Sequence, residues 1–131
     1  YRTKAKSLKK LGLCLQERYG GKVPTKLFEL VALPGVGRKT ANLVLSLAFS
    51  KEAICVDTHV HRITIRCGYV RTHSPLETEQ VLRGKLPSAW WISINTLLVS
   101  YGQNICRPIS PFCSSCSIER FCPHVGVTRQ R

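Results

Sequence analysis

Four cysteines near the C-terminal end of the chain constrain most strongly how this sequence can fold. They are separated by six, two and five residues, on a stretch rich in proline and serine: Cys106, Cys113, Cys116 and Cys122. Four thiolates so close together can converge on a single metal centre, and thiolates suit zinc or iron–sulfur clusters better than hard cations. The stretch has few large apolar residues, so metal–ligand bonds would have to hold it folded.

The spacing by itself leaves the kind of metal centre open. Zinc sites made of four cysteines usually use two knuckles of roughly two to four intervening residues, and only Cys113 and Cys116 form such a pair. The wider spacings favour a [4Fe–4S] cluster, with zinc, disulfides or free thiols as alternatives. The remaining cysteines lie in apolar patterns and are interpreted as small buried side chains; they are Cys14, Cys55 and Cys67.

The charge of the chain points to a polyanionic partner. Its 131 residues include 20 Lys and Arg against 7 Asp and Glu, a formal net charge of +13. Neutralising phosphates releases counterions and favours binding, so nucleic acid is the first partner to expect. A membrane surface would need a strongly amphipathic basic helix, which only residues 2–19 approach. No apolar run reaches the roughly 18 residues that span a bilayer.

Two further features of the chain bear on its origin. No apolar signal-type segment follows the N-terminus, so we expect a protein that is not secreted. The sequence contains no methionine, which predicts a processed product or a fragment. We also expect a monomer without membrane association.

The hydrophobic pattern predicts an all-α fold. Apolar residues recur at steps of three and four over 3–19, as on one face of a helix, and Gly20 is expected to end this helix. Further helices are expected over 26–33, over 57–67 and over 38–49, where apolar residues lie nearly all round. Pro75 and Pro87 are expected to open two more helices, since proline is favoured in the first turn. The helix after Pro87 has an apolar stripe made of Trp91, Ile94, Leu98, Tyr101 and Ile105. No convincing pair of strands is present, and prolines exclude long regular elements after Cys106.

A glycine-rich turn between two predicted helices is a candidate phosphate site. Backbone amides of residues 35–39 should converge at the start of the second helix, where the helix dipole favours an anion. A nucleotide P-loop is excluded, because Leu33 and Arg38 stand where that motif needs glycine and no strand precedes the turn. The pattern instead indicates a helix-hairpin-helix that grips DNA backbone, with a turn that binds nothing as the alternative. The candidate contacts are Leu33, Gly35, Val36, Gly37, Arg38, Lys39 and Thr40.

Two side chains are candidates for chemistry. Lys39 lies in the first turn of a predicted helix, where the positive end of the dipole and Arg38 would both favour the uncharged, nucleophilic amine. A lysine that only contacts phosphate is the alternative. Asp57, the chain's single aspartate, precedes another predicted helix. It can cap that helix and, because the cap fixes its carboxylate, can also stand beside a cationic transition state.

Three motifs in this order resemble a known family. The segments LPGVGRKTANLVL and VDTHVHR, followed by the C-x6-C-x2-C-x5-C cysteines, are similar to the endonuclease III branch of the helix-hairpin-helix DNA glycosylases, over about residues 4–122. The resemblance implies two helical lobes. Residues 1–52 would be the C-terminal part of the six-helix lobe with the hairpin, and residues 53–131 the iron–sulfur cluster lobe.

The resemblance also implies a function. It is that of a base-excision-repair DNA glycosylase with abasic-site lyase activity, which removes oxidised pyrimidines from double-stranded DNA through a lysine Schiff base. Lys39 would be the nucleophile and Asp57 its catalytic carboxylate. Arg107 would add a phosphate contact to those of the hairpin, and the cysteines would hold a [4Fe–4S] cluster of mainly structural and DNA-positioning role. A lysine at position 39 favours glycosylase/lyases over relatives that only remove the base.

Family members carry a further N-terminal segment that this sequence lacks. A catalytically incompetent DNA-binding fragment is therefore the alternative to an enzyme, and a zinc-stabilised nucleic-acid adaptor is a third reading. Thiol-ligated iron favours a reducing interior. We expect the cytoplasm or nucleoid, or the nucleus or mitochondrion of a eukaryotic cell.

Overall fold

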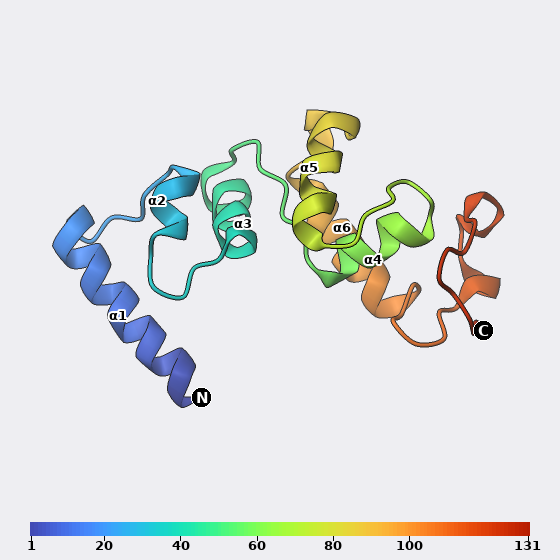
Figure 1. Cartoon of the computed structure of the whole chain (residues 1–131), viewed down its shortest axis with the longest axis horizontal. Coiled ribbons are helices and arrows are strands. Elements are labelled where there is room, and N and C mark those ends of the chain that lie inside the picture. Colours follow the sequence, from blue (N-terminus) through green and yellow to red (C-terminus); the bar gives the residue numbers. More distant parts are fainter. The chain divides into compact units, whose positions relative to one another are not determined.

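The computed structural model describes residues 1–131, and it contains helices and no strand. The all-α prediction is thus confirmed. The chain divides into two compact units, Tyr1–Ala53 and Ile54–Arg131, whose helices are labelled in Figure 1. None of the helices combines the length and the apolar character needed to pass through a bilayer.

The first unit consists of α1 (Arg2–Tyr19), α2 (Leu27–Val31) and α3 (Arg38–Phe49). Gly20, in a left-handed conformation with φ of 58°, ends α1 as the glycine pattern predicted. Helix α2 is shorter than expected, because its last turn tightens through a bond from the N–H of Leu33 to the carbonyl of Leu30. The buried side chains that hold this unit together are Leu30, Leu33, Ala41, Leu45 and Ala53.

The second unit contains α4 (Thr58–Arg66), α5 (Pro75–Lys85) and α6 (Ser93–Asn104). Three single 3₁₀ turns accompany them: η1 (Ser88–Trp90), η2 (Cys113–Ser115) and η3 (Glu119–Phe121). Helices α4 and α6 pack against each other. The apolar core beneath them is formed by Ile54, Val56, Val60, Val70 and Leu82.

The helix expected to begin at Pro87 begins later. Residues after Pro87 form η1, and α6 starts only at Ser93. Trp91 and Ile92, which connect the two, have helical backbone angles, so the chain after Pro87 starts as a tightened 3₁₀ turn and leads directly into α6. The indole N–H of Trp91 donates to the carbonyl of Leu86 at 2.8 Å, and its ring packs against the core.

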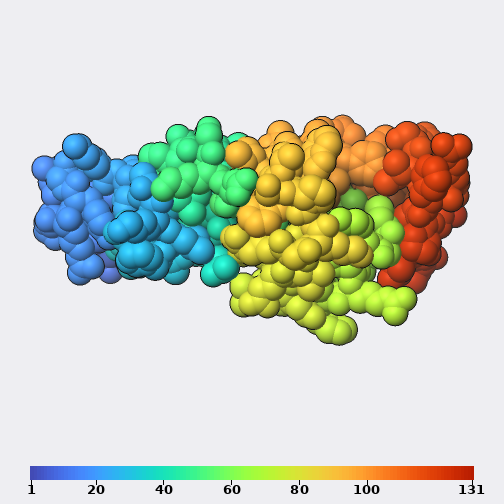
Figure 2. Space-filling model, turned by 90° about the horizontal axis from the view of Figure 1, so that it is seen from above, coloured from blue at the N-terminus to red at the C-terminus, as the bar shows by residue number.

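The segment after α6 has little regular structure, as predicted, but it is tied to the helices at several points. The N–H of Val125 donates to the carbonyl of Arg66 at the end of α4. The N–H of Arg131 donates to the carbonyl of Pro111, so the tail returns to the cysteine-bearing loop. Figure 2 shows this segment in red, gathered at one end of the second unit beside α6.

Candidate nucleic-acid interface and cysteine-lined cavity

The turn between α2 and α3 has the tight geometry that its glycines predicted. The N–H of Val36 donates to the carbonyl of Leu33 at 3.1 Å, and Gly35 adopts a left-handed φ of 76°. A Cβ added to Gly35 would lie 3.1 Å from the Cβ of Ser7 on α1. Both the backbone conformation and this close approach therefore require glycine at position 35.

The N-terminus of α3 has no side-chain cap. Gly37, in an extended conformation, is its N-cap residue and offers no side chain, whereas Asp57 caps α4 and Ser74 caps α5. The first backbone N–H groups of an α-helix have no partner within the helix, and the dipole makes this end positive. An anion placed at the start of α3 would thus find donors that no side chain of the cap residue occupies.

The candidate DNA contacts differ in exposure. Leu33 is only 4% exposed and belongs to the core, so any contact that it makes with a ligand must come from its backbone. Val36 is half-buried, and the others are exposed at the surface: Gly35, Gly37, Arg38, Lys39 and Thr40. Lys39 lies in the first turn of α3, next to Arg38.

A further lysine lies close to the hairpin. Lys4 and Ser7 of α1 line a shallow hollow together with Pro34 and Gly35 of the turn. The sequence predicts only that Lys4 belongs to the basic helix of residues 2–19, because nothing in the local pattern indicates that α1 lies against the hairpin turn. Its ammonium adds positive charge beside this turn.

Asp57 is the N-cap of α4, as predicted. Its side chain is largely buried, and Oδ1 accepts hydrogen bonds from the N–H groups of His59 and Val60, each at 2.9 Å. Oδ2 takes part in neither bond. The carboxylate is thus held in one orientation with one oxygen still available for a ligand. Lys39 belongs to the first unit and Asp57 to the second.

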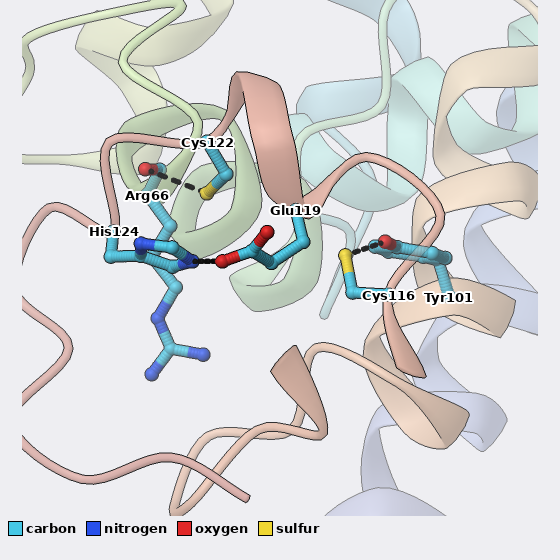
Figure 3. Close-up of polar contacts among 6 residues, drawn as sticks. All are labelled: Arg66, Tyr101, Cys116, Glu119, Cys122 and His124. Carbon is cyan, nitrogen blue, oxygen red and sulfur yellow. Dashed lines mark hydrogen bonds and ion pairs between the residues drawn. The ribbon is translucent and has the colours of Figure 1, made fainter. Parts of the chain in front are cut away.

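The four cysteines that the spacing singled out line one cavity in the second unit: Cys106, Cys113, Cys116 and Cys122. Two of them bond to neighbouring groups in Figure 3. The hydroxyl of Tyr101, on α6, lies 2.7 Å from Sγ of Cys116, and Sγ of Cys122 lies 3.4 Å from the carbonyl of Arg66. The structure thus brings together cysteines from both ends of the loop.

Arg66 organises the wall of this cavity. Its buried guanidinium donates to Sγ of Cys106 at 3.4 Å and to the carbonyls of Arg107 and Pro108 at 2.6 and 2.7 Å. These bonds tie the start of the cysteine loop to the end of α4 and place a positive charge beside one sulfur. Arg107 itself is exposed, and its guanidinium lies 4.9 Å from the centre of the Phe112 ring.

A fifth cysteine faces the same cavity. Cys67 is half-buried and lines the cavity beside the four motif cysteines. The interpretation as a small buried side chain describes Cys55, which is only 1% exposed, but it leaves out the position of Cys67 at the cavity. Tyr101 was likewise predicted only as part of an apolar stripe. Their partners lie 15 residues or more along the chain, so no local pattern could have identified either.

The electrostatics of the cavity favour neutral groups. Burial, followed by the adjacent Cys122, raises the pKa of the Cys67 thiol to about 12. Burial and the bond to Cys116 raise the pKa of the Tyr101 hydroxyl well above its ordinary value. Thiols crowded in this way repel each other once ionised, and a cation among them would reverse the effect by stabilising thiolates.

The donor set of the cavity is that of a soft metal centre. No group of three or more His, Cys, Asp or Glu side chains is arranged in the structure as a metal site. The four motif cysteines line the cavity together with largely apolar residues, among them Ile105, Phe112 and Val127. Soft thiolates around such a space suit an iron–sulfur cluster.

The hairpin and the uncapped helix define the class of protein. Residues 18–47, which span α2, the turn and most of α3, match the family model described as "Helix-hairpin-helix motif". Over nearly its whole length the chain is similar to members of the endonuclease III family. It is 49% identical over 122 residues to Endonuclease III of Thermotoga maritima, with 93% of this chain and 57% of that protein aligned.

Other relatives are similar over the same part of the chain. Endonuclease III homolog 2, chloroplastic, of Arabidopsis thaliana is 48% identical over 94% of this chain and 34% of its own length. A solved structure described as a trapped endonuclease III–DNA covalent intermediate superposes with a TM-score of 0.88 at 42% identity, covering 95% of this chain and 59% of the other. The chain thus spans from about a third to somewhat more than half of the length of these relatives.

Proposed function

We propose that this chain carries the hairpin and the reactive groups of a DNA glycosylase with abasic-site lyase activity, acting on oxidised pyrimidines in double-stranded DNA. One observation carries the proposal: Lys39 lies exposed in the first turn of the uncapped α3, at the end of the hairpin. Similarity to an endonuclease III that was trapped covalently on DNA supports it, since a covalent intermediate requires a nucleophile.

DNA binding in this proposal begins at the hairpin. A backbone phosphate would accept hydrogen bonds from N–H groups at the start of α3, where the dipole is positive. Gly35 and Gly37 leave the backbone open to this approach, and Lys4 and Arg38 add charge. Arg107 would contact a further phosphate from the second unit. The net charge of +13 supports binding of this kind.

The chemistry follows from the two side chains. With the damaged nucleotide flipped out of the duplex, the Nζ of Lys39 attacks C1′ of the sugar, and the bond from C1′ to the base breaks. The lysine nitrogen loses a proton and the departing base takes one up. The bond from C1′ to O4′ then breaks with protonation of O4′, which opens the sugar and leaves an iminium at C1′. This iminium makes the C2′ proton acidic, and removal of that proton expels the 3′ phosphate, so the strand is nicked 3′ to the site. Asp57 stabilises the cationic sugar and assists the proton transfers.

The four cysteines would hold a [4Fe–4S] cluster that stabilises the fold and supplies no step of the reaction. Such a protein should be brown, with broad absorbance at roughly 400 nm and bound iron. A colourless protein that carries one zinc ion would support the zinc-stabilised adaptor instead. Thiolate-bound iron would favour a reducing interior that contains DNA.

Borohydride trapping tests the reaction directly. When the protein is mixed with a duplex that contains one abasic site, borohydride should reduce the Schiff base to a stable covalent adduct. Lys39→Gln should abolish the adduct, lowering it at least about 100-fold. Lys10→Gln, which removes an equal charge from exposed α1, should trap as the wild type does.

The same experiment separates the enzyme from a binding fragment. The chain covers 57% of the Thermotoga maritima relative, and the alternative function is that of a fragment able to hold DNA without reacting. Intact DNA binding without any adduct would establish that alternative for this chain. An adduct that persists in Lys39→Gln would contradict the assignment of the nucleophile.

A further inference from the structure

Cys67 differs from the other two cysteines outside the four-cysteine motif. Cys14 packs against the apolar core of the first unit, and Cys55 is fully buried next to the core of the second. Cys67 instead ends α4 and lines the cavity that contains the four motif cysteines. The chain thus presents five thiols to a site for which four suffice.

Among the four, Cys122 is the one whose position the backbone ties to that of Cys67. The carbonyl of Arg66, one residue before Cys67, accepts from the N–H of Val125 at 3.1 Å and lies 3.4 Å from Sγ of Cys122. A Cβ added to Gly68 would lie 2.9 Å from Cγ of Pro123. Pro123, the residue after Cys122, thus packs against Gly68, the residue after Cys67.

The contacts of the residues beside Cys67 favour one end of the cysteine loop. Arg66 and Gly68, on either side of Cys67, lie against Cys122 and Pro123 respectively. Cys113 lies elsewhere on the loop, in η2. We therefore expect Cys67 to replace a ligand at the position of Cys122 and not at the position of Cys113.

We propose that Cys67 is a reserve ligand of the metal centre, able to replace Cys122 as the fourth thiolate. The proposal rests on the cysteine-bound cluster of the proposed function. In the exchange, Cys67 loses its proton to water and bonds to iron through Sγ, while the bond from iron to Sγ of Cys122 breaks and Cys122 takes up a proton. No electron is transferred, and the number of thiolate ligands stays at four. Oxidation or alkylation of Cys122 would then not release the metal.

Four variants of the full chain test this exchange, purified without oxygen. They are Cys67→Ala, Cys122→Ala, the double variant Cys67→Ala/Cys122→Ala, and Cys113→Ala as the matched control. Iron per chain and absorbance at roughly 400 nm are measured for each. Cys67→Ala should be loaded as the wild type is. Cys122→Ala should keep at least about half of the iron, and the double variant and Cys113→Ala less than about a tenth.

The outcomes separate this inference from the proposed function. Wild-type protein without iron would overturn the cluster and the reserve ligand together. If the wild type contained iron but Cys122→Ala contained as little iron as the double variant, the reserve ligand alone would be overturned. Iron retained by Cys113→Ala would also contradict the reserve ligand, because Cys67 is expected to replace Cys122 and not Cys113. A metal centre held by Cys67 should keep the loop folded when Cys122 is replaced. If both Cys122→Ala and a further variant, Cys122→Ser, were insoluble while the wild type was soluble, the reserve ligand would therefore be overturned too.

Discussion

At the scale of single residues, Asp57 combines a structural and a proposed chemical role. As the cap of α4 it accepts two backbone hydrogen bonds through one oxygen. Asparagine can accept the same bonds but carries no charge. Asp57→Asn should therefore leave thermal stability nearly unchanged, whereas Asp57→Ala should lower the free energy of unfolding by about 1 kcal/mol. Both should lose most of the abasic-site lyase activity, measured as strand cleavage.

Ser74 supplies the control for this prediction, because it caps α5 through one bond to the N–H of Glu77 and lies outside the proposed site. Ser74→Ala should cost a similar free energy of unfolding, about 1 kcal/mol, without loss of cleavage. If Asp57→Asn cleaved DNA as well as the wild type, the charge of Asp57 would have no part in the reaction and its role would be that of a cap alone.

At the scale of elements, the hairpin depends on the close contact between its turn and α1. Gly35→Ala adds a Cβ where φ is 76° and where Ser7 lies 3.1 Å away. We expect the first unit to lose about 1–2 kcal/mol of stability. DNA affinity should fall as well, because a displaced turn would no longer hold the backbone at the start of α3 in position for a phosphate. Urea unfolding and binding to a short duplex measure the two effects.

Gly12 gives the matched control for the hairpin variant. It lies inside α1 with a helical backbone, and an added Cβ would meet nothing within 4 Å. Gly12→Ala should stabilise the first unit by about 0.5–1 kcal/mol, because alanine loses less backbone entropy in a helix. If both alanine variants had the same effect, the conformation of Gly35 would not be what the hairpin requires.

The helices show which parts of this structure can be predicted from sequence. Helices α1, α3, α4 and α5 follow from apolar patterns or from local start and stop signals, such as Gly20, Asp57 and Pro75. The 3₁₀ turn before α6 does not follow, because Pro87 and the apolar stripe are equally compatible with an α-helical first turn. Local signals therefore suffice for the presence of a helix and for its capped ends, but not for the kind of turn at an uncapped end.

The residues of the cavity likewise fall into those that the sequence predicts and those that it does not. The loop spacing predicts that four cysteines can meet, since they are close in sequence. Arg66, Cys67 and Tyr101 come from helices whose apolar patterns are satisfied without them, and each meets the loop through a contact between distant positions. Sequence can therefore identify the ligands on the loop but not the helix residues that surround them.

At the scale of the whole molecule, the two units differ in how much of their fold depends on a core. The first unit has a continuous set of buried apolar side chains between α2 and α3. The stretch after α6 has almost none, and Ile109 and Phe121 are 83% and 70% exposed. Its protein contacts are mainly the bonds from Arg66 and the return of the tail to Pro111. A bound metal would thus contribute most of the stability of this stretch.

Metal removal should therefore unfold one part of the molecule and spare the other. After the iron is removed by a chelator under oxidising conditions, hydrogen exchange of the backbone should accelerate at least about tenfold over residues 106–131. Exchange over residues 27–49 should stay as it is in the loaded protein, because the core of the first unit contains no metal ligand. Mass spectrometry of peptides from the exchanged protein measures both regions in one sample. Equal acceleration in both would mean that the units unfold together, and unchanged exchange over 106–131 would mean that protein contacts alone hold the cysteine loop.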